Sequence, residues 1–399
     1  MTVNEQSLQS LYGDMVEWRR HLHRHPELSF QEYETSDMVA RLLEEWGLDV
    51  RRGVAGTGVV ARLDGGLPGR TIALRADMDA LPITDAKDCE YRSTAQGIMH
   101  ACGHDGHTAE LLAVAKYYSL RREETAGVRV FLFQPGEETL PGGAIRMIED
   151  GALDGVDAVY GVHLWSLLPC GTAATRPGPF MATPDEFEIE VVGRGGHGGL
   201  PHESKDALLA GAALVVALQT VVSRSVNPLD AAVLSVGRFS AGTANNVIAA
   251  DSKLAGTVRS FNKEMRELVR GRLEEIVKHT CAMHGCDYRF RFIEGYPPVV
   301  NDEREAERVL RLIAEHLPDT ESGPCERIMA GEDFSYYLER KPGCFFFVGA
   351  GKREGHSAPH HHPMFDLEEE AMLHAARLLI AVADDSALDT GAAAAPDGE

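Results

Sequence analysis

The chain of 399 residues carries a formal net charge of −22, because 61 acidic side chains outnumber 39 basic ones. This balance argues against a nucleic-acid-binding protein, which needs a basic surface, and against docking on anionic membranes. We find no apolar run that reaches the about 20 residues of a bilayer span, and no signal peptide. The seven cysteines, an odd number in a long chain, favour free thiols and a cytoplasmic location.

The first part of the chain alternates helical and extended patterns. Amphipathic spacing predicts helices over residues 5–24 and 33–46, and a run rich in alanine and leucine predicts another over 108–122. Short apolar runs bounded by glycine or proline predict strands at 56–63, 71–76, 128–133 and 157–162. This alternation predicts an α/β fold with a mostly parallel sheet, whose working residues gather at the carboxyl ends of the strands.

A different pattern begins near residue 183. It predicts a strand at 185–192, a helix at 204–223, strands at 232–239 and 253–261, a helix at 263–284 and a strand at 287–293. The order β-α-β-β-α-β is the ferredoxin-like arrangement. The α/β pattern then resumes with a helix at 303–316, a strand at 344–349 and a helix at 367–384.

We therefore predict a discontinuous larger domain with a smaller domain inserted into it. The larger domain comprises residues 1–182 and 295–385, and the inserted domain comprises residues 183–294. Residues 386–399 are small and polar, which predicts a disordered tail.

The run MHACGHDGH, from Met99 to His107, has the highest density of potential metal ligands in the chain. Thiolate, imidazole and carboxylate groups are the ligands of transition metals. Further donors end separate segments, as convergent ligands do: the pair Glu137-Glu138, His163, and the run from His360 to His362. These donors are sufficient for two cations about 3.5 Å apart, as in two-metal hydrolases.

The adjacent acids Glu137 and Glu138 are predicted to have two different roles. At a strand-to-loop turn, neighbouring side chains point in different directions, so one carboxylate can bind metal while the other acts as general base. A bound cation lowers the pKa of its water toward about 7. The pattern therefore predicts hydrolysis of an amide or an ester by metal-activated water.

Nine motifs in a fixed order extend this interpretation over almost the whole chain. They are LRADMDALPI, MHACGHDGHTA, FQPGEE, GVHLW, GRGGHGGLPH, GTANNVI, GTVRSF, AGEDFSYY and HHPMFDLEEE. From about residue 14 to residue 383 the chain resembles the dimetal aminoacylase and carboxypeptidase clan of metallopeptidases. The resemblance is greatest to the amidohydrolase branch, which acts on N-acyl amino acids.

The resemblance implies a role for each matched residue. The metal ligands would be Cys102, His104, Glu138, His163 and His361. Glu137 would be the general base, and His197 would offer its imidazole to the developing oxyanion. Asn246 and Arg259 would bind the substrate, since an arginine suits a free carboxylate. Asp79 would contact the metal ligands without binding the metal itself.

The same resemblance implies cofactors and partners. We expect two divalent metal ions per subunit, zinc or manganese first and cobalt or nickel as further candidates. The substrate would be a small N-acyl amino acid, cleaved to a carboxylate and a free amino acid. The inserted domain would act as a lid and form a homodimer, with His197 acting within its own chain or across the dimer.

Other interpretations of these residues stay open. His197 among glycines also fits a loop, Asn246 beside Asn245 a turn, and Arg259 a surface ion pair. We expect His21, His23 and His25 to be solvated, because a spacing of two scatters them around a helix. For the same reason the quartet His279, Cys281, His284 and Cys286 is not expected to bind metal. The alternative functions are a dipeptidase of the same clan and a non-catalytic metal- or ligand-binding protein.

Overall fold

The computed structural model describes residues 3–318, 324–352 and 355–389. The chain divides into two compact units. The larger unit contains the chain up to Gly178, Val300–Glu326 and the part from Asp333 onward, and the smaller unit contains Pro179–Val299 and Arg327–Glu332. Each unit has its own hydrophobic core.

Among the described residues, the main sheet of the larger unit has the strand order β1-β2-β4-β3-β5-β15-β6. Its strands are β1 (Asp49–Val54), β2 (Gly58–Asp64), β3 (Leu67–Asp77), β4 (Ala126–Gln134), β5 (Ala158–Pro169), β6 (Ala173–Ala174) and β15 (Gly343–Gly351). The central strands β4, β3, β5 and β15 pair in parallel, and the pairs at both edges are antiparallel. The predicted α/β class with a mostly parallel sheet is confirmed.

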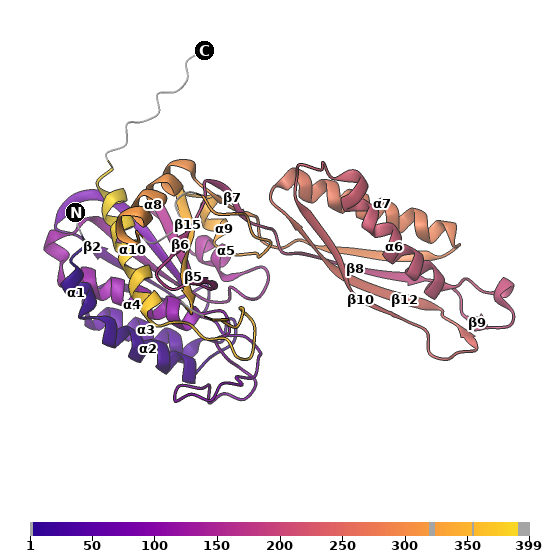
Figure 1. Cartoon of the computed structure of the whole chain (residues 1–399), viewed down its shortest axis with the longest axis horizontal. Coiled ribbons are helices and arrows are strands. Elements are labelled where there is room, and N and C mark those ends of the chain that lie inside the picture. The colour runs from indigo at the N-terminus through magenta and orange to yellow at the C-terminus, as the bar shows by residue number, and fades with distance from the viewer. Residues whose placement is uncertain (1–2, 319–323, 353–354, 390–399) are drawn as a thin grey trace, which may run out of the picture. The chain divides into compact units, whose positions relative to one another are not determined.

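Helices of the larger unit cover this sheet and fill its core (Figure 1). They are α1 (Glu5–Gln9), α2 (Tyr12–Arg24), α3 (Tyr33–Glu45), α4 (His104–Leu120), α5 (Gly143–Glu149), α8 (Glu303–His316), α9 (Ser335–Leu338) and α10 (Glu370–Ala387), with a short 3₁₀ helix at Arg122–Glu124. Helices α4 and α10 contact each other and strands β3 and β5, and both are buried along most of their length.

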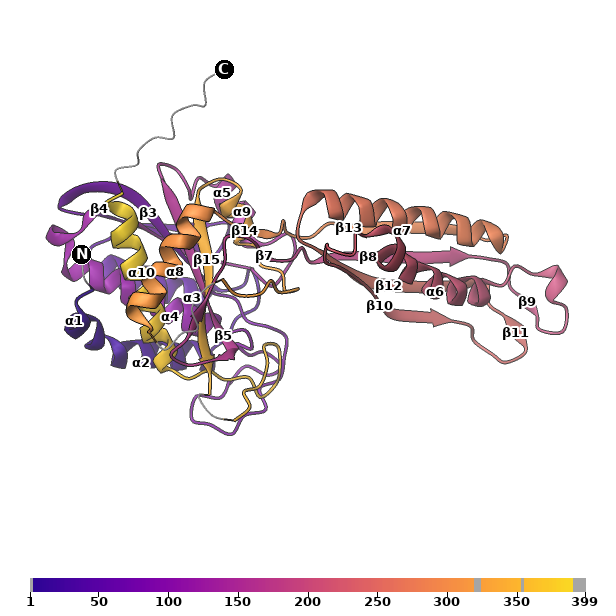
Figure 2. The same cartoon turned by 45° about the horizontal axis from the view of Figure 1, so that its top comes forward.

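The smaller unit contains an antiparallel sheet in the order β10-β12-β8-β13. Its elements are β8 (Asp185–Val192), α6 (Ala207–Ser225), β10 (Ala232–Ala241), β12 (Asp251–Ser260), α7 (Lys263–Met283) and β13 (Asp287–Ile293). This is the β-α-β-β-α-β order that the sequence predicts. Helices α6 and α7 lie side by side on one face of the sheet (Figures 1 and 2). Shorter elements are β7 (Gly178–Met181), β9 (Gly196–His197), β11 (Val247–Ile248), β14 (Val299–Asn301) and a 3₁₀ helix at Pro201–Glu203.

Several predicted boundaries differ from the structure. The helix predicted at 5–24 is two helices, α1 and α2, and α10 extends to Ala387, two residues into the predicted tail. The rest of that tail, from residue 390, lies outside the described residues. The segment Arg327–Glu332 groups with the smaller unit because Ile328 N–H donates to Phe180 O at 3.0 Å and Ala182 N–H donates to Ala330 O at 2.9 Å.

The prediction that no apolar run reaches the length of a bilayer span is wrong for helix α6. By length and composition its 19 residues are sufficient, with a mean hydropathy of 1.7 over the most apolar window. One such helix is weak grounds for a membrane segment, because the core helix of a globular unit passes the same test. Leu214 and Leu218 of α6 are fully buried in the core of the smaller unit.

Helix α4 carries an acidic side chain inside the apolar core. Glu110 is 1% exposed, and neither of its carboxyl oxygens has a hydrogen-bond partner among the described residues. Burial, and secondarily the charge of Asp77, raises the pKa of Glu110 well above its usual value. Burial therefore opposes ionisation of this carboxyl group in the folded chain, whereas nothing opposes it in the unfolded chain.

Replacing this acid should stabilise the protein, and more so as the pH rises. Above the ordinary carboxyl pKa of 4.5 the unfolded chain ionises Glu110, whereas the raised pKa opposes ionisation in the folded chain, so folding becomes less favourable with increasing pH. We expect Glu110→Met to raise the free energy of unfolding by about 1–3 kcal/mol at neutral pH, and by less near pH 4. Urea unfolding of variant and parent at both pH values tests this. An equal or lower stability of the variant at pH 7 would contradict it.

Candidate metal centre

The predicted metal donors gather at the carboxyl end of the parallel sheet. Strand β3 ends at Asp77, and β4 ends at Gln134 just before the acid pair Glu137-Glu138. His163 lies within β5, which continues to Pro169 beyond the strand end that the sequence predicts. Since parallel strands present their carboxyl ends at one edge, segments far apart in the sequence deliver side chains to one place.

The start of α4 explains how Cys102 and His104 enter this place together. Gly103 between them has a φ of 98°, a left-handed conformation that favours glycine, and it is the N-terminal cap of the helix. The helix therefore begins at His104, four residues before the predicted start at Thr108. Because the chain turns sharply at Gly103, the Cys102 thiol and the His104 imidazole can both reach the site although they are only two positions apart.

The structure brings all five predicted ligands into one cluster. Cys102 Sγ lies 3.5 Å from His163 Nε2. Glu138 Oε1 lies 3.2 Å from His361 Nε2 and 4.0 Å from His104 Nε2. The donor atoms of Cys102, Glu138 and His361 are all within 4.8 Å of one another, and so are those of His104, Glu137 and Glu138. Glu138 thus belongs to both groups.

Two buried atoms of this cluster face other potential metal donors, an arrangement that fits a cation between them. His104 Nε2 and Glu138 Oε1 are buried, and neither has a hydrogen-bond partner among the described residues. A buried polar atom without a partner costs free energy. A cation between a neutral imidazole nitrogen and a carboxylate oxygen would satisfy both.

In the two buried histidines, His104 and His163, the Nδ1 atom lies within hydrogen-bonding distance of a backbone carbonyl oxygen. His104 Nδ1 lies 2.9 Å from the carbonyl oxygen of Asp79, and His163 Nδ1 lies 3.1 Å from that of Leu164. A carbonyl accepts only, so each Nδ1 carries a proton, and a lone pair for a metal ion can form only at Nε2. This is the usual arrangement behind a metal-binding histidine.

Asp79 contacts the residues on either side of the candidate site, as its predicted supporting role requires. Its carboxylate accepts the N–H groups of Glu137 at 3.1 Å and Glu138 at 3.0 Å, and it lies 3.3 Å from His104 Nδ1. Burial opposes ionisation of Asp79, but hydrogen bonds, that of His104 first, hold its pKa below the usual value. One buried carboxylate therefore fixes a histidine and the turn of the acid pair.

Removing this carboxylate should weaken metal binding without removing a ligand. We expect Asp79→Ala to lower zinc affinity by about 10- to 100-fold, the usual effect of losing a partner behind the ligands. Competition with a chromophoric chelator measures this affinity. The matched control is Asp64→Ala, at the exposed end of β2, which should change nothing. An unchanged affinity in the Asp79 variant would contradict the supporting role.

The surrounding charges favour a cation at this place. Burial, together with the carboxylates of Glu138 and Glu137, raises the pKa of the Cys102 thiol well above its usual value. Burial, with His107 and His360 nearby, lowers the pKa of His163 well below its usual value. The imidazole is thus neutral, which is the form that binds metal. A divalent cation would reverse the effect of the carboxylates and favour the thiolate.

Metal affinity should rise with pH. Burial alone would lower the pKa of His104, but the carboxylates around it, that of Asp77 first, raise it to about 10. A cation at Nε2 must therefore displace a proton at neutral pH. Calorimetric titration with zinc in buffers of different ionisation enthalpy should show proton release and tighter binding at pH 8 than at pH 6. Binding that is independent of pH would contradict this.

Asp77 and His107 form a supporting pair that the sequence indicates only in part. His107 Nδ1 lies 2.7 Å from Asp77 Oδ1, and His107 Nε2 accepts the Leu164 N–H at 2.9 Å. Both nitrogens of His107 are thus used, which holds this imidazole in one orientation beside the predicted ligands. Asp77 was not among the predicted site residues. Its position at the end of a buried strand, two residues before Asp79, is the signal that could have indicated it.

Among the three consecutive histidines, His361 is the one beside Glu138. Its φ of 63° is uncommon for a residue other than glycine, and such strained positions concentrate at functional sites. Its N–H donates to Ala101 O at 2.8 Å, which ties this loop to the segment before Cys102. His360 instead accepts the Ser166 N–H at 3.1 Å, although it also lies near Cys102 and His163.

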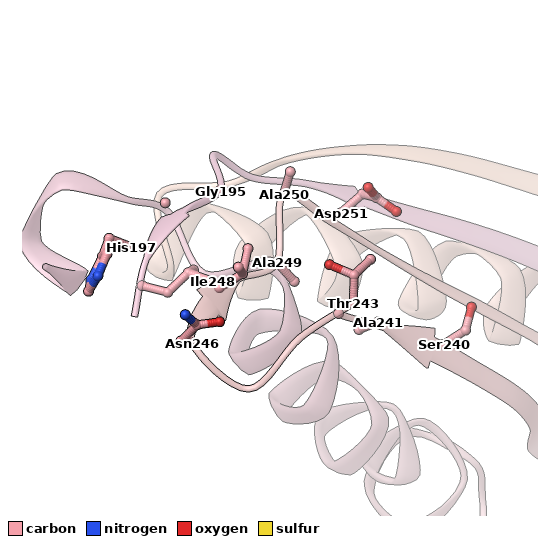
Figure 3. Close-up of a pocket in the computed structure, with 13 residues that line it drawn as sticks. Gly195, His197, Ser240, Ala241, Thr243, Asn246, Ile248, Ala249, Ala250 and Asp251 are labelled. Atoms are coloured by element: carbon pink, nitrogen blue, oxygen red, sulfur yellow. The ribbon is translucent and has the colours of Figure 1, made fainter. Parts of the chain in front are cut away.

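Two predicted site residues, His197 and Asn246, line one pocket of the smaller unit (Figure 3). Its volume is about 600 Å³. His197 lies on β9, which pairs with β11, and Asn246 lies in the turn before β11. Gly198 N–H donates to Asn246 O at 2.7 Å, so the backbone holds the two segments together. Both side chains are exposed in this unit.

Arg259, the third predicted site residue of the smaller unit, lies on β12 and is half-buried. It donates to the carbonyl oxygens of Val258 at 3.0 Å and Asp185 at 3.3 Å, and to the Thr257 hydroxyl. Burial lowers the pKa of its guanidinium. Within the described part of the chain it forms no ion pair, so the surface ion pair considered above is not what holds it.

One histidine expected to be solvated is buried. His23 Nδ1 lies 2.7 Å from Asp105, and His23 Nε2 lies 2.9 Å from Lys87 Nζ. His23 Nε2 also lies 3.2 Å from Asp85 Oδ2, so the ring lies between two carboxylates and a lysine. His21 and His25 are exposed, as expected. The quartet from His279 to Cys286 is absent from the clusters of metal donors found in the described residues.

A parallel sheet with candidate metal ligands at its carboxyl ends fits a metal-dependent hydrolase. The chain belongs to the peptidase family M20/M25/M40, which it matches over residues 73–385. The resemblance drawn from the motifs is therefore confirmed.

Relatives of the chain carry amidohydrolase and peptidase names. A putative amidohydrolase, YhaA, of Bacillus subtilis is 47% identical over 96% of this chain and 96% of its own length. An N-acyl-L-amino acid amidohydrolase of Geobacillus stearothermophilus is 46% identical over 83% of this chain and 92% of its own length. Thermostable carboxypeptidase 2 of Saccharolobus solfataricus is 38% identical over 90% of this chain and 91% of its own length.

Solved structures support the same family. The YXEP protein of Bacillus subtilis, described as a dinuclear metal binding peptidase, has a TM-score of 0.81 and 35% identity, and the match covers 94% of this chain and 98% of that one. A putative aminohydrolase from methicillin-resistant Staphylococcus aureus has a TM-score of 0.89 and 38% identity, with 96% and 98% covered.

Proposed function

We propose that the chain is a metal-dependent amidohydrolase that cleaves N-acyl amino acids to a carboxylate and a free amino acid. The observation that carries the proposal is the cluster in which two adjacent acids, Glu137 and Glu138, share one imidazole neighbour, His104. Names of relatives in the same family, such as N-acyl-L-amino acid amidohydrolase and N-acetyl-L-cysteine deacetylase, support this substrate class.

We further propose two divalent ions per chain, zinc or manganese first and cobalt or nickel as alternatives. The proposed ligands are Cys102, His104, Glu138, His163 and His361. A mixed shell of thiolate, imidazole and carboxylate accepts all four metals. When bound, such ions polarise a carbonyl group and lower the pKa of water. Removal by a chelator should abolish hydrolysis, and the metal that restores most activity identifies the preferred ion.

The proposed role of Glu137 is to move a proton. Its side chain is buried, and its backbone N–H is held by Asp79. A carboxylate oxygen of Glu137 would accept the proton of the attacking water and deliver it to the leaving nitrogen. General bases with this task typically contribute about 10²- to 10⁴-fold to the rate.

Residues of the smaller unit are proposed to complete the reaction. His197 would donate a hydrogen bond from its imidazole to the oxyanion that forms on the amide carbonyl. Asn246, which lines the same pocket, and the half-buried Arg259 would bind the amino-acid part of the substrate. A unit that carries such groups acts as a lid when it closes over the site.

A substrate screen tests the proposed activity. N-acetyl, N-benzoyl and indole-acetyl amino acids, incubated with each candidate metal, should release free amine. The relatives named carboxypeptidases favour one second candidate, hydrolysis of a peptide bond, as in a dipeptidase. Faster turnover of dipeptides than of every acyl amino acid would select that alternative. No turnover of either class would favour a non-catalytic metal-binding protein.

We also propose a homodimer that forms through α6. The side of this helix away from the core exposes Leu208, Leu209 and Val216, which are 44%, 55% and 71% exposed. Three exposed apolar side chains on one helix fit an interface between copies of the chain. Leu209→Glu with Val216→Glu should yield monomers in sedimentation experiments in which the parent sediments as a dimer. A monomeric parent would overturn the proposal.

A cytoplasmic location remains part of the proposal. All seven cysteines are described, and each is a free thiol, which fits a reducing compartment. Fractionation of the producing cells should recover the chain with cytoplasmic markers, and its recovery from an exported fraction would contradict this.

A further inference from the structure

A segment near the N-terminus lies against the turn that carries the acid pair. Leu28 forms a β-bridge with Ala80, next to Asp79. The hydroxyl of Ser29 donates to Asp79 Oδ2 at 2.7 Å, and it accepts from the Thr139 hydroxyl at 3.1 Å. The segment 28–32 therefore contacts residues on both sides of Glu137 and Glu138, although it is more than 100 positions away in the sequence.

Glu32 makes the contact that matters most for the acid pair. Its side chain is fully buried, and its Oε1 accepts the N–H of Gly136 at 2.8 Å and that of Phe30 at 2.9 Å. Its other oxygen accepts the Thr57 hydroxyl at 2.5 Å. Gly136 directly precedes Glu137, so one buried carboxyl group holds the peptide that begins the acid pair.

The conformation of Gly136 leaves little freedom for this turn. Its φ is 60°, in the left-handed region. A Cβ atom at this position would come within 2.5 Å of the Phe30 ring. The ring is itself covered by Arg146, whose guanidinium lies 4.2 Å from its centroid. The turn is thus fixed by Phe30 on one side and by the Glu32 hydrogen bond at its N–H.

We propose that Glu32 is a positioning residue that sets the place of Glu137 through its hydrogen bond to Gly136 N–H. The proposal rests on the proposed function, because it concerns the base of that reaction. Glu32 touches neither substrate nor metal ligand in this role. A displacement of about 1 Å in a catalytic group can lower a rate about 100-fold, so a distant residue that fixes the turn has a measurable effect on kcat.

The ionisation state of Glu32 leads to a conservative variant. Burial raises its pKa to about 7, the Thr57 hydroxyl opposes this, and the charge of Asp79 adds to it. Because the hydrogen bond from Gly136 requires only an accepting oxygen, a neutral amide can replace the carboxyl group. In Glu32→Gln the amide oxygen accepts from Gly136 and Phe30, and the amide nitrogen donates to the Thr57 oxygen.

Three variants test the proposal by kcat, KM and bound metal. Glu32→Ala removes the acceptor, and Glu32→Gln retains it. Glu27→Ala is the matched control, because this nearby glutamate also accepts two backbone N–H groups, those of Glu34 and Thr35, but none from the acid-pair turn. We expect Glu32→Ala to lower kcat by about 10- to 100-fold with KM and metal content unchanged. Glu32→Gln should stay within about threefold of the parent, and Glu27→Ala should keep its kcat.

Amide hydrogen exchange supplies a readout that needs no activity. The peptide that contains Gly136 should exchange faster in Glu32→Ala than in the parent, and at the parent rate in Glu32→Gln and Glu27→Ala. If the parent hydrolyses no amide, the proposed function fails, and the exchange rates still test the positioning of the turn. An unchanged kcat in Glu32→Ala, a loss of kcat accompanied by loss of metal, or unchanged exchange would overturn the proposal.

Discussion

Glu137→Gln should lower kcat by about 10²- to 10⁴-fold, the usual contribution of a general base. Glutamine has nearly the same shape as glutamate but cannot accept a proton from water at neutral pH. The backbone N–H of Glu137, held by Asp79 at 3.1 Å, stays in place in this variant. We therefore expect the two bound ions and KM to remain close to their values in the parent.

Steady-state kinetics together with metal analysis of the same preparation check this expectation. Equal metal content in parent and variant excludes loss of the site as the cause of a lower rate. Hydrolysis at the parent rate by a metal-loaded Glu137→Gln protein would show that another group moves the proton.

Glu138→Ala should remove metal as well as activity. Its Oε1 lies between His361 Nε2, at 3.2 Å, and His104 Nε2, at 4.0 Å, so one carboxylate adjoins donors from two separate segments. We expect the bound metal to fall from two ions per chain to at most one. The loss of kcat/KM should exceed the about 10- to 100-fold that follows from losing a partner behind the ligands.

Elemental analysis after equilibrium dialysis measures this loss. The matched control is Glu149→Ala, which removes an exposed carboxylate at the end of α5 and should keep both ions. Two tightly bound ions in Glu138→Ala would contradict the ligand role of Glu138 and leave the position of the second ion without an explanation.

Local patterns predict the candidate donors outside the His360–His362 run, because those donors lie in or near a strand or a helix that hydrophobic spacing indicates. Glu138 follows the buried strand β4, and His104 begins α4. Because the central strands pair in parallel, their carboxyl ends and the segments that follow them lie at the same edge of the sheet. The left-handed φ of His361, by contrast, results from a loop whose path no local pattern indicates.

The features that sequence reasoning missed depend on contacts between distant segments. His23 is buried because Asp105 and Lys87, from two other parts of the chain, meet its ring. Glu32 holds Gly136, 104 positions away. Periodicity on one helix or strand cannot reveal such partners, since it reports which face is apolar and not what covers a polar group.

The most direct test is to locate the metal in crystals of the purified protein by anomalous scattering at the zinc edge. Our account requires two peaks per chain, with Cys102, His104, Glu138, His163 and His361 each contacting at least one of them at about 2.0–2.3 Å. A single peak would contradict the dimetal hydrolase described above. So would two peaks if any one of these five side chains contacted neither of them in every crystal measured.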